Sequence, residues 1–132
     1  MELDEKTRAF LLEKRFAVLA TVSANGEPQQ TVMWYDLDGD TILMNTSGER
    51  LKARNLRRNP VASICVEDEY HYVTIAGDVQ LVEDRETALR DIKRLALRYH
   101  EDEQVAERMM QDFAKQQRVT LRLNPKRVLT RF

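Results

Sequence analysis

The chain has 132 residues, of which 42% are hydrophobic and 33% are charged, and its formal net charge is −1. This length suits one domain with one hydrophobic core, so we expect a single domain over residues 1–132. The near-neutral charge favours neither nucleic acid nor an anionic membrane surface as a partner. Any site for an anion must therefore come from a local cluster of basic residues.

The N-terminus and the cysteine content favour a cytoplasmic protein. The first ten residues are acidic and amphipathic, unlike a signal peptide, and the longest apolar run, around Phe16–Ala20, is far shorter than the roughly 20 residues that span a bilayer. Cys65 is the only cysteine, which excludes an intramolecular disulfide. His71 and His100 are the only histidines and lack the spacing of metal ligands, so we expect no metal site.

The first third of the chain is predicted to form a helix and three strands. Two tight turns, Asn25-Gly26 and Asp38-Gly39-Asp40, separate segments rich in β-branched and aromatic residues. Asp4 lies near the start of the helix, where negative charge is favoured. The predicted elements are a helix over 4–14 and strands over Phe16–Ser23, Gln29–Leu37 and Thr41–Asn45.

The rest of the chain alternates between helices and strands. Thr46 with Glu49 three residues later has the spacing of a capping box, and this helix should end before Asn59-Pro60 because a residue before proline avoids the α region. Gly77 inside a long strand indicates a bulge or bend. The remaining predicted elements are strands over Val61–Val66 and Tyr70–Asp84, two helices between Glu86 and Lys115 with a break near Tyr99–Glu103, and strands over Arg118–Leu123 and 126–132 separated by Asn124-Pro125.

This order of elements predicts a mainly β protein with flanking helices. Six or more mostly antiparallel strands in a small domain favour a closed barrel, because closure removes exposed strand edges. The helices would then cover one end or one side of the barrel. An open α+β sandwich is the structural alternative.

The segment RLKARNLRR, Arg50–Arg58, contains five basic residues and no acidic one. Small hydrogen-bonding residues, Asn45–Gly48, precede it at the expected start of the helix. A helix N-terminus with free N–H groups, hydroxyls and nearby cations can bind phosphate. A solvated basic face that balances the 22 acidic residues is the alternative, and composition alone does not decide between the two.

The stretch LMNTSGERLKARNLRRNPVASICV resembles the central motif of the pyridoxamine 5′-phosphate oxidase-like split β-barrel family. FAVLATVSANGEPQQTVMWYDLDGD is similar to the first hairpin of that family, and YVTIAGDVQLVED is similar to a later long strand. The similarity therefore covers nearly the whole chain, and LKARNLRRNP is typical of the short deazaflavin-dependent members. The resemblance implies an FMN-binding split β-barrel that forms a homodimer.

The resemblance also implies where a cofactor would bind. Its phosphate would lie near the turn and the basic helix, its ring along the second strand, and the partner subunit would complete the site. By position, the cofactor-binding residues are Gln29, Thr31 and Val32 at the ring, Asn45, Thr46, Ser47, Arg50 and Lys52 at the phosphate, and Tyr70 and His71 from the partner subunit. Trp34 is expected either to fill the core or dimer interface or to stack near the cofactor.

The function that the resemblance implies is transfer of hydride from reduced coenzyme F420 to a small conjugated organic acceptor. We expect no catalytic residue in the chain, because such a cofactor brings its own hydride. F420 is favoured because its tail carries carboxylates that Arg54, Arg57 or Arg58 could meet. The alternatives are an FMN-dependent oxidoreductase of the same fold and a binding protein without turnover. Oxidation of pyridoxamine phosphate is not expected, because no histidine follows His100.

Overall fold

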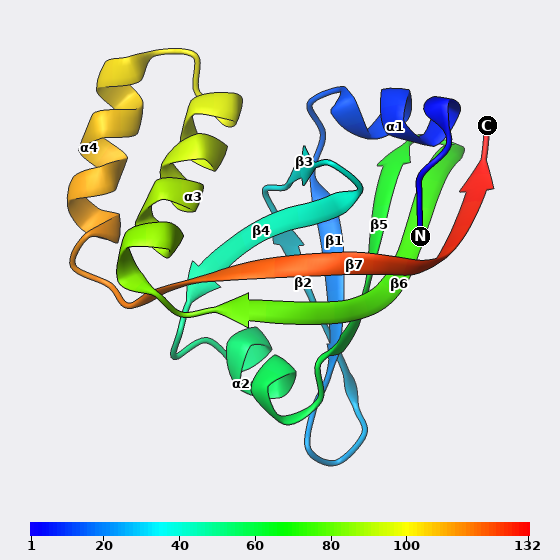
Figure 1. The fold of residues 1–132 in the computed structure, drawn as a ribbon, viewed down its shortest axis with the longest axis horizontal. Coiled ribbons are helices and arrows are strands. Elements are labelled where there is room, and N and C mark those ends of the chain that lie inside the picture. Colours follow the sequence, from blue (N-terminus) through cyan, green and yellow to red (C-terminus); the bar gives the residue numbers. More distant parts are fainter.

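Seven antiparallel strands form one curved sheet, and four helices lie around it (Figure 1). The structure is a computed structural model that describes all 132 residues. Helices α3 and α4 pack together on one side of the sheet, α1 lies at one end and α2 at the other (Figure 1). In chain order the elements are α1 (Glu5–Leu12), β1 (Ala17–Val22), β2 (Pro28–Met33), β3 (Asp36–Asp38), β4 (Thr41–Ser47), α2 (Leu51–Arg58), β5 (Val61–Asp68), β6 (His71–Val82), α3 (Arg85–Tyr99), α4 (Glu103–Phe113) and β7 (Arg118–Arg131).

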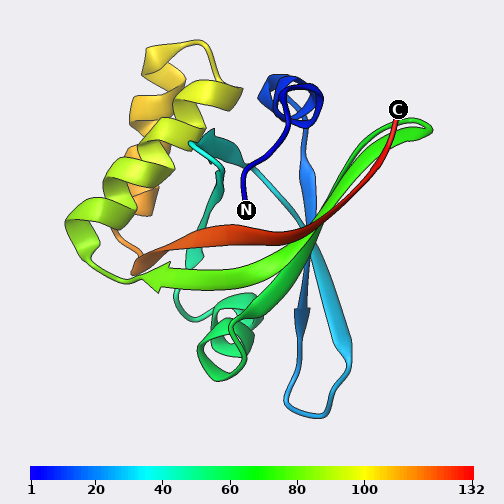
Figure 2. The ribbon, with the colours of Figure 1, turned by 45° about the vertical axis from the view of Figure 1, so that its right-hand side comes forward.

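The order of strands across the sheet is β2-β1-β5-β6-β7-β4-β3, which makes β2 and β3 its two edges. Only Trp34 and Tyr35 separate these two edge strands in the chain, and consecutive Cα atoms are about 3.8 Å apart. The sheet must therefore curl until its edges meet, as Figure 2 shows. Because no ladder joins β2 to β3, the barrel is split at this point, and the predicted split β-barrel is confirmed over the open sandwich.

Tyr99, the last residue of α3, joins the connection between β2 and β3 to the segment that leads into β1. Its hydroxyl accepts a hydrogen bond from the backbone N–H of Tyr35 (3.1 Å) and donates one to the carbonyl of Arg15. Its ring stacks between those of Phe16 and Trp34, with a centroid distance of 5.4 Å to each. A helix from the second half of the chain thus packs against the connection between β2 and β3.

The predicted single strand over Gln29–Leu37 is wrong, because the chain leaves one edge of the barrel at Trp34 and joins the other at Asp36. Tyr35 lies between the two and is fully buried, and its hydroxyl donates to the carbonyl of Leu11 (2.8 Å). Burial raises the pKa of Tyr35 to about 12. The break follows from the split of the barrel and not from a local turn signal.

The predicted break at Asn124-Pro125 is also wrong, since β7 runs through it without interruption. The reason lies on β6, where the register with β7 shifts between Ala76 and Gly77 and leaves Pro125 opposite Gly77. The irregularity predicted at Gly77 is thus confirmed, and the extra residue, Lys126, lies on β7. A Cβ atom on Gly77 would lie 1.9 Å from the carbonyl oxygen of Asn124, so only glycine fits here.

The predicted capping box at Thr46 and Glu49 is wrong. Thr46 and Ser47 continue β4, because they pair with Val119 and Arg118 on β7. Helix α2 starts later, at Leu51, and its N-cap residue makes no side-chain hydrogen bond to the first turn. The predicted end of this helix before Asn59-Pro60 is confirmed.

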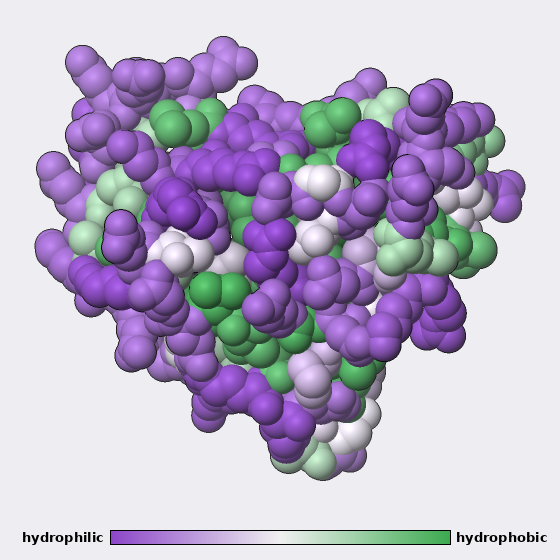
Figure 3. Space-filling model, viewed as in Figure 1, coloured by the Kyte–Doolittle hydropathy of each residue, from purple (hydrophilic) through white to green (hydrophobic).

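Strand β4 is buried on both faces, from Ile42 to Ser47. One face, with Ile42 and Met44, belongs to the hydrophobic core inside the barrel, and the other lies under α3. Figure 3 shows a mostly hydrophilic surface on which hydrophobic side chains gather between β6 and α2 and toward the C-terminal end of β7. None of the helices is long and apolar enough to cross a membrane.

Candidate functional site

A hollow of about 380 Å³ opens at the end of β4, between β2, α2 and the α3–α4 pair. It brings together residues that are far apart in the sequence and combines a polar end with an apolar wall. The predicted cofactor-binding residues that line it are Val32, Asn45, Thr46, Ser47, Arg50 and Lys52. The other lining residues are Met33, Trp34, Ile92, Leu95, Phe113 and Arg118.

The polar end of the hollow contains buried groups that lack partners. The hydroxyl of Ser47 is buried and makes no hydrogen bond. Lys52 is only 7% exposed, and no carboxylate lies within 4.0 Å of its ammonium group. Burial, then the positive charges of Arg50 and Arg118, lower the pKa of Lys52. Unpartnered buried donors are costly, so these groups fit a bound anion that would accept from them.

Arg118 also belongs to this polar end, although no motif in the sequence includes it. It lies at the start of β7, directly opposite Ser47 on β4. Its guanidinium lies over the ring of Phe113, 4.7 Å from the centroid, and donates from Nη1 to the side chain of Gln116 (2.7 Å). Burial, then the charge of Arg50, lower the pKa of Arg118 to about 10. Only the register between β4 and β7 shows that Arg118 lies beside Ser47 at the polar end.

Both ends of the Asn45 amide are already used within the chain. Its oxygen accepts from Nε of Arg118 (2.9 Å), and its nitrogen donates to the carbonyl of Ala88 (2.9 Å). Asn45 thus lines the hollow as part of a buried network. That it holds a phosphate itself stays a prediction.

Strand β2 borders the hollow with one free edge. It pairs only with β1, so one row of its backbone N–H and C=O groups has no strand partner. Val32 is 67% exposed and lines the hollow. Gln29 and Thr31 do not line it: Gln29 accepts a hydrogen bond from Thr21 (3.0 Å), and the hydroxyl of Thr31 is buried without a partner.

Tyr70 and His71 lie at the other end of β6 from the hollow (Figure 1). Tyr70 is 85% exposed in the β5–β6 turn, and His71 borders a separate hollow with Phe10 and Phe132. Neither residue lines the hollow. That they complete the site from the partner subunit stays a prediction.

The arginines of α2 differ in the ion pairs and hydrogen bonds that they make within the chain. Arg57 pairs with Glu83 (3.1 Å) and donates to the carbonyl of Gly48 (2.8 Å). Arg58 donates to the carbonyl of Val22 (2.6 Å). Arg54 is exposed and makes no ion pair, so it is the one most available to a ligand.

Trp34 forms part of the apolar wall of the hollow. One face of its indole stacks on Tyr99, and its ring meets that of His100 edge-on at 5.6 Å. Tyr99 and His100, at the C-terminal end of α3, thus hold the indole in place, and the indole presents aromatic surface to the hollow. No group of three His, Cys, Asp or Glu side chains lies close enough together to hold a metal ion.

The family profile described as pyridoxamine 5′-phosphate oxidase matches residues 3–132. The chain belongs to this family. The resemblance of its hairpins and central motif is thereby confirmed over almost the whole chain. Pyridoxamine oxidase family members are commonly dimeric and bind flavin-type cofactors.

Solved structures with different names share the fold of this family. A conserved hypothetical protein, Rv2991 from Mycobacterium tuberculosis, superimposes with a TM-score of 0.80 at 27% identity, covering 98% of this chain and 84% of that one. An F420 reductase gives 0.71 at 23% identity, covering 96% and 98%. The heme storage protein HutZ from Vibrio cholerae gives 0.74 at 25% identity, covering 98% and 95%. Names that refer to such different ligands mean that the fold alone does not assign a cofactor.

Proposed function

We propose that the protein is an oxidoreductase that binds reduced coenzyme F420 and passes its hydride to a small conjugated organic acceptor. The observation that carries the proposal is the hollow beside β4. It joins a buried hydroxyl without a partner and a lysine ammonium without a carboxylate partner to the free edge of a β-strand. A phosphate bound at one end and a flat ring lying along the other match this arrangement of groups.

Each part of the hollow has its own role in the proposal. Ser47, Arg50 and Lys52, with the backbone at Thr46, would hold the phosphate through charge-assisted hydrogen bonds. The free edge of β2 at Gln29–Val32 would bind the polar edge of the ring. The cofactor supplies the hydride when bound, and the chain supplies binding, orientation and exclusion of water, for which Trp34 offers an apolar wall.

F420 is the first choice of cofactor and FMN the second. The fold is one that a protein named F420 reductase adopts, and the exposed Arg54 is free to meet the carboxylates of the F420 tail. FMN remains the second candidate because a phosphate site near Lys52 does not depend on the chemistry of the ring. A protein that binds either cofactor without turnover is the third.

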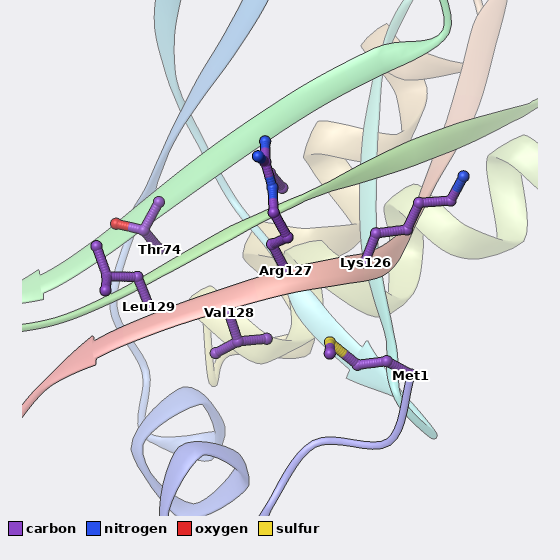
Figure 4. A pocket seen from close by; sticks show the side chains of 7 residues that line it. Met1, Thr74, Lys126, Arg127, Val128 and Leu129 are labelled. Atoms are coloured by element: carbon purple, nitrogen blue, oxygen red, sulfur yellow. The ribbon is translucent and has the colours of Figure 1, made fainter.

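We also propose that the protein forms a homodimer through the outer face of the sheet. A row of uncharged side chains crosses this face in register: Val18 on β1, Cys65 on β5, Thr74 on β6 and Leu129 on β7. Thr74 and Leu129 lie side by side in Figure 4, next to a hollow of about 550 Å³. Leu129 is 62% exposed, and exposed apolar surface of this kind is typical of a subunit interface. In such a dimer Tyr70 and His71 would belong to the partner's site.

The test of the cofactor is a comparative titration of the purified protein with F420 and with FMN, followed by fluorescence. We expect F420 to bind tighter, and reduced F420 to be oxidised when one of a panel of enones, quinones or tetrapyrroles is added. Tight binding of FMN without any response to F420 would contradict the assignment of the cofactor. Tight binding of F420 without oxidation against the panel would identify a binding protein instead of an enzyme.

A further inference from the structure

A chain of hydrogen bonds runs from the hollow into the protein interior beneath α3. Nε of Arg118 donates to the amide oxygen of Asn45 (2.9 Å), and the amide nitrogen of Asn45 donates to the hydroxyl of Thr120 (3.4 Å). That hydroxyl donates to Oδ2 of Asp91 (2.7 Å), whose side chain lies on α3. Asn45, Asp91 and Thr120 are all buried.

Every donor in this chain points the same way, from a cation toward an anion. The guanidinium of Arg118 stands at one end and the carboxylate of Asp91 at the other, so each bond polarises the next in the same sense. The direction leaves the amide of Asn45 no freedom to flip, because its nitrogen also donates to the carbonyl of Ala88 (2.9 Å). The network is therefore a rigid support with one orientation.

This support holds Arg118 at two of its three nitrogens. Asn45 takes Nε, the side chain of Gln116 accepts from Nη1, and the ring of Phe113 lies beneath the plane. Nη2 makes no hydrogen bond within the chain, and Arg118 lines the hollow beside Lys52. No carboxylate lies within 4.0 Å of the guanidinium. A fixed guanidinium with one free donor nitrogen fits an oxygen of an anion.

We propose that Arg118 is a third cation of the anion site, with Arg50 and Lys52, and that Asn45, Thr120 and Asp91 position it. Three cations around one hollow match a ligand that carries a phosphate group, whether as the monoester of FMN or as the diester of F420. This inference rests on the proposed function for the nature of the ligand. It changes the role of Asn45, which acts on the anion through Arg118.

The test measures the binding of two ligands to the same set of variants. The first is inorganic phosphate, and the second is the cofactor compared with its phosphate-free form, which is riboflavin for FMN and, for F420, the deazaflavin core that lacks the phosphate together with the tail. Arg118→Gln should weaken binding of the phosphate-bearing cofactor by about 10- to 100-fold, as expected for loss of a charged hydrogen bond, and should change binding of the phosphate-free form by less than about 3-fold. Arg118→Lys should lose most of this affinity too, because a lysine cannot be held at two nitrogens.

Thr120→Val breaks the support without changing any charge. It should weaken binding of the phosphate-bearing form by about 3- to 10-fold, and Thr120→Ser, which keeps the hydroxyl, should restore it. In the Arg118→Gln background, Thr120→Val should cause no further loss, because positioning residues act only through the residue they position. Arg108→Gln, at an exposed site on α4, and Thr130→Val, at an exposed site on β7, are the matched controls and should bind like wild type.

The outcomes separate this inference from the proposed function. Binding of a phosphate-bearing cofactor that Arg118→Gln leaves unchanged would overturn the inference and leave the function standing. Arg118-dependent binding of inorganic phosphate, with no binding of either cofactor, would support the inference and overturn the function. Binding of neither phosphate nor cofactor by wild type would overturn both. An equal effect of Thr120→Val with and without Arg118 would refute the positioning role.

Discussion

Lys52 lowers the stability of the protein without ligand, and we interpret this as a consequence of its place in a binding site. Its side chain is mostly buried, it has no carboxylate partner, and Arg50 and Arg118 are the nearby charges that further disfavour its charged form. A buried cation in such surroundings destabilises the fold until an anion binds. Residues of this kind persist in proteins where binding requires them.

Replacing this charge should therefore stabilise the protein without ligand. We expect Lys52→Met, which keeps the length and apolar stem of the side chain, to raise the free energy of unfolding by about 1 kcal/mol. Urea denaturation in a buffer free of phosphate measures the change. Arg54→Met, at an exposed position of the same helix, is the control and should stay within about 0.5 kcal/mol of wild type. A loss of stability in Lys52→Met would mean that its ammonium has a partner within the fold.

The charge of Lys52 also predicts how affinity depends on pH. F420 carries a phosphodiester and should bind equally on both sides of pH 6, whereas binding of FMN, a monoester, should strengthen as pH rises through about 6, where its phosphate loses its second proton. Binding of either cofactor should weaken as pH rises through the Lys52 pKa, which lies below 10.5, because the neutral amine no longer attracts the anion. Dissociation constants measured across this range test both limbs. Lys52→Arg should move the alkaline limb to higher pH, and an unmoved limb would assign it to another group.

At the scale of elements, the pairing of β6 with β7 depends on one glycine, Gly77. The carbonyl of Asn124 approaches Gly77 so closely that any Cβ would clash with backbone. We expect Gly77→Ala to lower the free energy of unfolding by about 3 kcal/mol, as in other cases where a core must shift. Gly26→Ala is the comparison, since φ is +87° there but the space is open, and it should cost about 1 kcal/mol. Equal effects of the two in urea denaturation would argue against the close approach.

The hydroxyl of Tyr99 should stabilise the connection between β2 and β3. Tyr99→Phe keeps the ring stack with Trp34 and removes the bonds to Tyr35 and Arg15, so we expect a loss of about 1–2 kcal/mol. Thermal unfolding measures it, with Tyr70→Phe in the exposed turn as the control. An unchanged midpoint for Tyr99→Phe would mean that the ring alone holds this connection in place.

Local signals in the sequence predicted most of the helices and strands. They failed where the arrangement of the sheet overrides the local preference of the residues. The turn at Asn25-Gly26, the irregularity at Gly77 and the helix end before Pro60 follow from the residues themselves. The strand break at Trp34 does not, because its cause is a barrel edge that the neighbouring residues do not encode. Pro125 lies within a strand only because a residue 48 positions away is a glycine.

The same distinction applies to the site. Ser47, Arg50 and Lys52 were predictable because they lie within one short segment whose composition is unusual. Arg118 and Asp91 were not, since each is an ordinary charged residue until the β4–β7 register and the packing of α3 bring it to Asn45. The sequence pattern therefore identifies the residues that lie close together in the chain. The residues that the fold brings to them can be identified only from the structure.

At the scale of the whole molecule, the proposed dimer couples assembly to binding. Leu129→Glu places a charge in the uncharged row on the outer sheet face, and we expect it to convert the dimer to a monomer in light scattering. Cofactor affinity should fall with it, because the partner's residues would be lost from the site. Leu12→Glu, at an exposed position on α1, should change neither property. A Leu129→Glu protein that stays dimeric would place the interface elsewhere.

The most direct test of the account is the contribution of the phosphate to cofactor binding, measured calorimetrically in wild type, Lys52→Met and Arg54→Met. For wild type we predict that the phosphate-bearing cofactor binds at least about 10-fold tighter than its phosphate-free form. Lys52→Met should abolish this preference, and Arg54→Met should retain it. Equal affinity of wild type for the two forms would contradict the central claim that the hollow beside β4 holds the phosphate of a flavin-type cofactor.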